Sequence, residues 1–285
     1  EKGLAPACGF NLILTTNLPL SAGLSSSAAV ELATALSLLQ LGNHTLGKLD
    51  LARLCRHAEN EFVGVPCGIL DQGVSTHGEK GHLVLIDCRK ESFSTLKLPG
   101  ETYVWVFDTG IKHDLVDSLY ATRNNECTEA IKRLQEQEGN LSCLAEVKAE
   151  MLSEAKLPNI LSKRSRHVIE ETIRVEQAIE LLRSEANPKE IGSLLFASHE
   201  SSRDLFENSC PELDFLVDDL KNRKGVLGAR LTGGGFGGAT LSWTNKAFTK
   251  SEAEGVARTY ENKFGVRPEI HKFEVSDGAR IITNL

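Results

Sequence analysis

The sequence predicts a mixed α+β protein with a domain boundary near residue 100. Three observations support this class. Strand-like and helix-like segments alternate over the first hundred residues, a largely helical stretch follows from 117 to 186, and the chain ends in strands that flank a glycine cluster. The 285 residues, 41% of them hydrophobic and 25% charged, are typical of globular proteins with one large or two moderate domains.

The elements of the first domain follow from local patterns. Residues 11–16 are rich in apolar and β-prone types and predict a strand. Residues 28–41 predict a helix, because Leu32, Leu36 and Leu39 fall on one face. The other predicted elements are a second helix at about 49–62 and a short strand near 83–87, and a further short strand near 103–107 follows just beyond the boundary.

The second domain begins with helices and ends with strands. Within the helical stretch, residues 167–182 place an apolar stripe close to a 3.6-residue period, which we interpret as core packing; it consists of Val168, Val175, Ile179 and Leu182. The tail predicts strands at 225–231 and 239–243, a helix near 252–264 and a last strand. We assign residues 1–100 to the first domain and 101–285 to the second, and allow the last strand to return to the first.

Composition excludes several classes of protein. A net charge of −7 gives no basic footprint, which argues against a nucleic-acid binder but not against an anionic ligand held by backbone donors. The most apolar stretch, 28–41, is short and contains Glu31, so no membrane span is visible. Seven scattered cysteines without a C-x-x-C pair predict reduced thiols in a cytosolic protein. Neither that pair nor H-E-x-x-H is present to indicate a zinc site.

The segment from Pro19 to Ala29, PLSAGLSSSAA, is a candidate phosphate-binding loop. Gly23 permits a sharp bend, and Ser25, Ser26 or Ser27 can cap the helix that follows. The first amides of a helix lack intrahelical partners and lie at the positive end of its dipole, so small side chains here leave a site for phosphate. A serine-capped helix without a ligand remains an equal alternative on these residues alone. The segment is not a Walker A loop.

Two further segments carry special residues. Residues 232–238, TGGGFGG, match G-x-G-x-x-G, but a β-type run follows instead of a helix, so we reject a dinucleotide-binding fingerprint. Five glycines favour a backbone that another group approaches closely over a simple hairpin. Asp71 lies between Gly68 and Gly73 in an apolar loop, either as a helix cap or facing a substrate hydroxyl.

Together, these segments resemble the galactokinase branch of the GHMP kinases along the whole chain. Residues 19–29 resemble the family's phosphate loop, and 66–72, PCGILDQ, with 80–87 behind it, resemble the segment of the catalytic aspartate. Residues 228–238 resemble the third, glycine-rich motif. Supporting stretches are 112–113, 116–120 and 209–214.

This resemblance implies a two-domain GHMP kinase fold with the active site in the cleft between the domains. It implies transfer of a phosphoryl group from ATP, with Mg²⁺, to the anomeric hydroxyl of galactose in galactose catabolism (the Leloir pathway). Asp71 would be the catalytic carboxylate, and Gly68, Asp71 and Tyr120 would contact the sugar. The implied ATP contacts are Gly23, Leu24, Ser25, Ser26, Ser27 and Ala28, with Ser27 as the magnesium ligand. The implied glycine-rich loop is Gly233, Gly234, Gly235, Phe236 and Gly237.

One family motif, G-R-x-N-L-x-G-E-H-x-D-Y, does not occur in the sequence. In the family it supplies an arginine beside the catalytic aspartate and contacts to the sugar hydroxyls. We therefore expect an N-terminally incomplete sequence and little or no turnover by residues 1–285 alone.

Several alternatives stay open. The first is another sugar kinase of the same family, for arabinose or N-acetylgalactosamine. The second is a non-catalytic galactose and ATP sensor, which the intact SSSAA at 25–29 disfavours. An NAD-dependent oxidoreductase is disfavoured by the strand after Gly238. The expected partners are a small sugar and ATP, in a cytoplasmic monomer or weak homo-oligomer that binds neither nucleic acid nor membrane.

Overall fold

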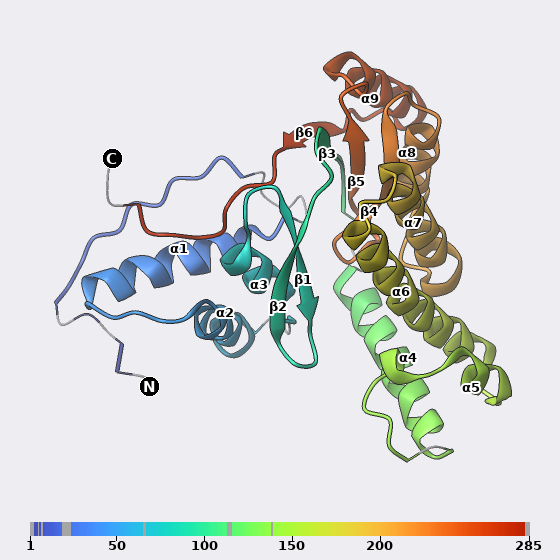
Figure 1. Ribbon diagram of the computed structural model, residues 1–285, viewed down its shortest axis with the longest axis horizontal. Helices are drawn as coiled ribbons and strands as arrows, with labels where there is room; N and C mark the ends of the chain where they lie inside the picture. Colours follow the sequence, from blue (N-terminus) through green and yellow to red (C-terminus); the bar gives the residue numbers. More distant parts are fainter. Residues whose placement is uncertain are drawn as a thin grey trace. The chain divides into compact units, whose positions relative to one another are not determined.

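The structure is a computed structural model that describes residues 3, 4, 6, 8–18, 24–64, 67–112, 116–137 and 139–282, without the side chains of 112 and 116–118. Its contacts divide the chain into two compact units (Figure 1): unit 1 is Glu1–Leu98 with Val275–Leu285, and unit 2 is Pro99–Glu274. The sequence placed the division at residue 100 and allowed the last strand to return to the first domain. In the structure the last strand pairs within unit 2, and the segment after it joins unit 1.

Unit 1 consists of helices and one antiparallel hairpin. Its elements are α1 (Ser26–Leu41), α2 (Lys48–His57), the π-helix η1 (Ala58–Val63), α3 (Leu70–His77), β1 (His82–Asp87) and β2 (Ser92–Lys97). The three helices pack on one another around a small core formed by Leu32, Leu39, Leu51 and Cys55. Leu36 packs against this core from the same face of α1, so the predicted apolar face of this helix is confirmed.

The hairpin is fixed to the helices from both sides. Glu91, in its turn, accepts hydrogen bonds from Arg53 Nε at 2.6 Å and Arg56 Nη1 at 2.7 Å, both on α2. Phe93 lies so close to α3 that a Cβ on Gly73 would stand 2.4 Å from its ring. The Phe93 ring also stacks on His77, with centroids 4.0 Å apart. These contacts hold α3 between α2 and the hairpin.

Residues 275–282, which we call the C-terminal strap, run along α3. Gly278 N donates to Gly78 O at 2.9 Å and Ala279 N donates to Ser75 O at 2.7 Å. Asp277 Oδ1 accepts from Lys80 N at 2.9 Å. The strap therefore supports the last turn of α3 by backbone hydrogen bonds.

Unit 2 contains a four-stranded antiparallel sheet and most of the helices. The strand order is β4-β5-β3-β6, with β3 (Thr102–Lys112), β4 (Val226–Thr232), β5 (Gly237–Asn245) and β6 (Glu269–Phe273). The helical elements are α4 (Val116–Gln135), η2 (Leu144–Glu146), α5 (Ala149–Glu154), α6 (Asn159–Arg183), α7 (Pro188–Ser201), the π-helix η3 (Ser202–Phe206), α8 (Pro211–Lys221) and α9 (Lys250–Phe264).

Two cores stabilise unit 2. Trp105 and Phe107 of β3 pack with residues of α8 and α9, including Leu216 and Tyr260, in the larger one. The second core joins α4, η2 and α6 through residues such as Leu134 and Leu161. Burial of this apolar surface is the main favourable term for folding.

Two predicted features differ from the structure, and one strand was not predicted. Residues 11–16 are not a strand: Ile13 is 89% exposed, and no strand of the described chain pairs with this segment, so its β-prone residues have no ladder to join. The predicted stripe on α6 is wrong at Val175, which is half exposed, although Val168 packs against the second core. Strand β2 was not predicted, because its alternation of serine and threonine with Phe93 and Leu96 is weak.

Helices α3, α7 and α8 and the π-helix η3 were not predicted, whereas the remaining elements agree with the prediction within a few residues. The second helix is split into α2 and η1, and the helical stretch into α4, α5 and α6. All seven cysteines are unpaired, as predicted. No helix in the described ranges has both the length and the hydropathy needed to span a bilayer.

Candidate active site

The start of α1 presents backbone amides that no side chain caps. Ser25 occupies the N-cap position in a left-handed conformation, with φ 55° and ψ 41°, and no side-chain oxygen accepts from the first turn. A helical hydrogen bond runs from Ala29 N to Ser25 O, at 3.2 Å. Within the described residues, the amides of residues 26–28 have no capping partner and are available to an anion, and the first turn of α1 holds no acidic residue.

The predicted serine cap is wrong, and the backbone explains why. A capping residue takes an extended conformation that turns its hydroxyl toward the N2 or N3 amide, whereas Ser25 is left-handed. A left-handed residue followed by helical ones directs successive amides into one concavity, a nest suited to anions. Ser27 is exposed and Ala28 is buried. Gly23 lies outside the described residues, whereas Leu24 is half-buried just before the helix.

Asp71 lies in the first turn of α3, not in a loop as predicted. Helix α3 begins at Leu70, with Ile69 as its N-cap residue. An acidic side chain in a first turn is favoured by the helix dipole. In the described part of the chain, no hydrogen bond or ion pair is formed by the Asp71 carboxylate, so it is free to meet a substrate.

Gln72 ties the start of α3 to the start of α1. Its amide nitrogen donates to Glu31 Oε2 at 3.1 Å and to Glu59 Oε2 at 2.6 Å, and the whole side chain is buried. Glu31 lies one helical turn beyond Ser27 on α1. The free amides of α1 and the carboxylate of Asp71 therefore belong to neighbouring helix starts of one unit.

Three carboxylates gather at this junction. Burial raises the pKa of Glu31, the hydrogen bond from Gln72 lowers it, and the charges of Glu59 and Asp71 raise it again. A cation would relieve this crowding, and hard oxygen donors are those that Mg²⁺ prefers. Among the described residues, no three His, Cys, Asp or Glu side chains form a metal cage.

The residues that build this junction could not be predicted from the sequence. Asn60 holds the segment before α3 by accepting from Cys67 N at 2.9 Å and donating to Cys67 O at 3.3 Å. Neither Asn60, Glu59 nor Gln72 belongs to a spacing pattern, so only the packing identifies them. Gly68 is exposed, and a Cβ there would meet nothing within 4 Å.

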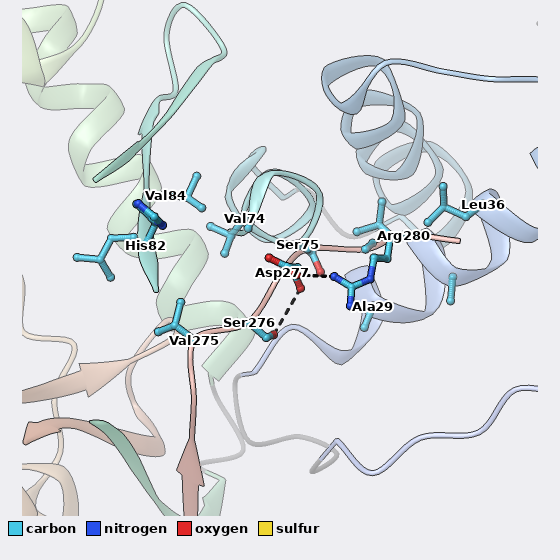
Figure 2. A pocket seen from close by; sticks show the side chains of 16 residues that line it. Ala29, Leu36, Val74, Ser75, His82, Val84, Val275, Ser276, Asp277 and Arg280 are labelled. Carbon is cyan, nitrogen blue, oxygen red and sulfur yellow. Dashed lines mark hydrogen bonds and ion pairs between the residues drawn. The ribbon is translucent and has the colours of Figure 1, made fainter. Parts of the chain in front are cut away.

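Unit 1 also contains a cavity of about 590 Å³ between α1, α3, β1 and the C-terminal strap. Figure 2 shows Leu36, Val74, Val84 and Arg280 around it, with Arg280 directed to Asp277. Of the candidate phosphate-binding loop, Ala29 lines this cavity, whereas none of the implied ATP, sugar or magnesium contacts among the described residues does.

In unit 2, the predicted glycine-rich loop is the turn between β4 and β5. Because β5 follows it directly, the rejection of a dinucleotide-binding fingerprint is confirmed. The backbone has positive φ at Gly233, Gly235, Phe236 and Gly237. A Cβ on Gly235 would stand only 2.0 Å from the backbone oxygen of Asn208, so the close approach predicted for this cluster exists.

Tyr120 and the glycine turn lie together within unit 2. Tyr120, on α4, is 55% exposed, and its ring is 3.5 Å from the place that a Cβ on Gly234 would take. The structure thus brings the predicted residues together in two groups: the start of α1 with Asp71 in unit 1, and Tyr120 with the glycine turn in unit 2.

Comparison with known proteins identifies the family. The profiles described as "GHMP kinases N terminal domain" and "GHMP kinases C terminal" match residues 1–79 and 177–266. A galactokinase of Thermotoga neapolitana is 42% identical over 270 residues, which are 94% of this chain and 75% of the relative.

Solved structures agree with this. The crystal structure of Lactococcus lactis galactokinase complexed with galactose matches with a TM-score of 0.85 and 30% identity, over 92% of this chain and 68% of that one. The L. major mevalonate kinase in complex with R-mevalonate, at 21% identity, shares the fold with a TM-score of 0.60 over 90% of this chain and 67% of that one. The chain therefore belongs to the galactokinase family of the GHMP kinases, which are two-domain phosphotransferases of mixed helix and strand.

Proposed function

We propose that the protein transfers the γ-phosphoryl group of ATP to the anomeric hydroxyl of galactose, giving galactose 1-phosphate and ADP. The observation that carries this proposal is the uncapped start of α1 beside the helix that bears Asp71. An anion site next to an unpaired carboxylate is what phosphoryl transfer to a hydroxyl requires. The relatives that share most of the chain are galactokinases, and the matched Lactococcus structure has galactose bound.

The backbone of α1 serves the phosphate chain. The amides of residues 26–28 point toward the anion and need no rearrangement when charge develops on the γ-phosphoryl oxygens. When bound with ATP, Mg²⁺ neutralises phosphate charge. The Ser27 hydroxyl is our candidate ligand for this ion, with the carboxylates near Asp71 as further oxygen donors.

Asp71 serves the sugar. Its carboxylate accepts the proton of the anomeric hydroxyl as that oxygen bonds to the γ-phosphorus, while the bond from phosphorus to the bridging oxygen of ADP breaks. Positioning of the hydroxyl in line with this bond supplies most of the remaining rate enhancement. Gly68 and Tyr120 are our candidates for sugar contact, and the glycine turn for backbone contact beside Tyr120.

We further propose that the protein acts in the cytoplasm on freely diffusing sugar and ATP, as a monomer or weak homo-oligomer. The unpaired state of all seven cysteines supports a reducing compartment.

The test is an Asp71→Asn substitution in the full-length protein. Asparagine keeps the shape but cannot take the proton, so we expect kcat to fall by about 10² to 10⁴, with ATP binding unchanged. Asp50→Asn is the matched control, because Asp50 lies in the first turn of α2 in the same unit. Formation of galactose 1-phosphate is measured by phosphorus NMR, with arabinose and N-acetylgalactosamine as competing acceptors.

Full activity of the Asp71→Asn protein would contradict the assigned role. Unchanged turnover with another sugar in place of galactose would contradict the assigned substrate.

A further inference from the structure

Asn208, two residues after the π-helix η3, contacts the glycine turn of unit 2 through both its backbone and its side chain. The backbone oxygen of Asn208 accepts from Phe236 N at 2.7 Å, and its side-chain Nδ2 donates to Gly234 O at 3.1 Å. Between these two bonds, Gly235 lies against the backbone oxygen of Asn208, with no room for a Cβ. Asn208 is 7% exposed, so water does not replace these contacts.

Two arginines fix the segment that carries Asn208. Arg123, on α4, donates from Nε to Phe206 O at 2.6 Å and from Nη2 to Glu207 O at 2.9 Å. Arg164, on α6 and 1% exposed, donates to Leu205 O. Three consecutive carbonyls at the end of η3 are thus satisfied by guanidinium groups. We call Arg123 and Arg164 the arginine brace.

Two glutamates balance the charges of the arginine brace, and one of its arginines contacts the glycine turn. Glu126 accepts from Arg164 Nε at 2.6 Å and from Arg123 Nη1 at 3.2 Å, and Glu207 accepts from Arg164 Nη2 at 2.9 Å. The Arg123 guanidinium also lies 5.6 Å from the centre of the Phe236 ring, within the range of a cation–π contact. Buried, hydrogen-bonded arginines of this kind hold a segment in one arrangement.

We propose that Asn208 is a positioning residue, which fixes the glycine turn and, through Gly234, the surface on which the Tyr120 ring rests. The proposal rests on the proposed function, because it assigns the turn and Tyr120 to sugar binding. Any residue at position 208 can accept the hydrogen bond from Phe236 N through its backbone oxygen. The bond from Nδ2 to Gly234 O requires the amide, so specificity for asparagine lies there.

The unpaired oxygen of the amide strengthens the assignment. Asn208 Oδ1 is buried and has no hydrogen-bond partner within the described chain. A buried polar atom without a partner is unfavourable, so the residue is not explained by its contribution to stability alone. The side chain of Asn208 adds one hydrogen bond to the turn and leaves one buried oxygen without a partner.

The experiment compares Asn208→Asp, Asn208→Ala and a matched control, Asn222→Asp, in the full-length protein. Asparagine and aspartate have the same shape, but aspartate would place an acceptor against Gly234 O and push the turn away. Asn222 also donates through Nδ2 to a backbone oxygen, that of Asp218 at 2.9 Å, at the end of α8.

We expect Asn208→Ala to raise the KM for galactose about fivefold, and Asn208→Asp to raise it more than tenfold. The KM for ATP and kcat should change less than about twofold. The turn stabilises the bound sugar equally in the ground state and in the transition state, so its displacement weakens sugar binding without slowing the chemical step. Asn222→Asp should match the parent protein. Circular dichroism verifies the fold of each variant, and hydrogen exchange of the Phe236 amide reports directly on the turn.

Each outcome decides the matter. Aspartate worse than alanine in galactose KM, with faster exchange at Phe236, supports the proposal. Galactose KM values equal to that of Asn222→Asp overturn it, and so does loss of kcat alone. If the parent protein phosphorylates no galactose, the proposed function fails, and exchange at Phe236 then decides whether Asn208 holds the turn: faster exchange in Asn208→Asp supports this, and unchanged exchange refutes it.

Discussion

Gly235 shows how a single residue position is fixed by both conformation and space. Its φ is +83°, and a Cβ would stand 2.0 Å from a backbone oxygen that cannot move as a flexible side chain would. We expect Gly235→Ala to lower the free energy of unfolding by about 3 kcal/mol, as the sum of left-handed strain and displacement of the turn. Urea denaturation measures this value.

The control for this prediction is Gly238→Ala. Gly238 has φ +80°, but a Cβ there would meet nothing within 4 Å. Gly238→Ala should therefore lower the free energy of unfolding by only about 1 kcal/mol, the cost of placing alanine in a left-handed conformation. Equal losses in the two variants would show that the close approach of Asn208 does not constrain the turn.

At the scale of elements, the C-terminal strap positions the helix that bears Asp71. A Cβ on Gly278 would stand 2.7 Å from Ser75 O and 3.0 Å from Gly78 N, both on or next to α3. We expect Gly278→Ala to displace the strap, destabilise unit 1 by about 1–2 kcal/mol and open the chain to proteolysis near residue 275.

Gly9→Ala is the matched control, since a Cβ at Gly9 meets nothing within 4 Å. Limited proteolysis followed by mass spectrometry locates the cuts. Equal rates of cleavage in the two variants would contradict a supporting role for the strap.

The elements that the sequence predicted are those whose pattern is local. Helix α1 was predictable because Leu32, Leu36 and Leu39 repeat at helical spacing, and the turn of glycines because five of them stand between two β-type runs. The strap was not, because its partners on and next to α3 are distant in sequence, and β2 was not, because its apolar alternation is weak although its partner β1 is adjacent. The sequence likewise assigned residues 11–16 to a strand from composition, but a strand exists only where a neighbour pairs with it.

The same limit applies to the site. Serines after a glycine indicate a helix start, yet the left-handed Ser25 that leaves the amides uncapped is visible only in the backbone. Asp71 was identified by family resemblance, but its place in a helix, and the Gln72 bridge to Glu31, depend on tertiary packing.

For the molecule as a whole, a half-buried histidine in unit 1 and a buried one in unit 2 contribute to the dependence of stability on pH. Burial lowers the pKa of His77 in unit 1, and that of His167 in unit 2 to about 4. Their neutral forms are favoured in the fold, so the stability they contribute is present above pH 6.5 and is lost as pH falls through the folded pKa. Glu31 has the opposite effect on stability: because its pKa is raised, the stability that it contributes is lost as pH rises.

His167 should dominate this loss. It lies on α6, with Nδ1 2.9 Å from Ser201 Oγ and its ring stacked on Phe206, and the charges of Glu171, Arg174 and Arg230 surround it. From pH 7 to pH 4, we expect the parent protein to lose on the order of 3 kcal/mol more stability than His167→Gln, which keeps a polar contact to Ser201 but does not titrate. Urea denaturation at half-unit pH steps measures both slopes. Exposed His57→Gln should follow the parent, and a slope for His167→Gln equal to the parent's would show that the acid sensitivity of the chain arises elsewhere.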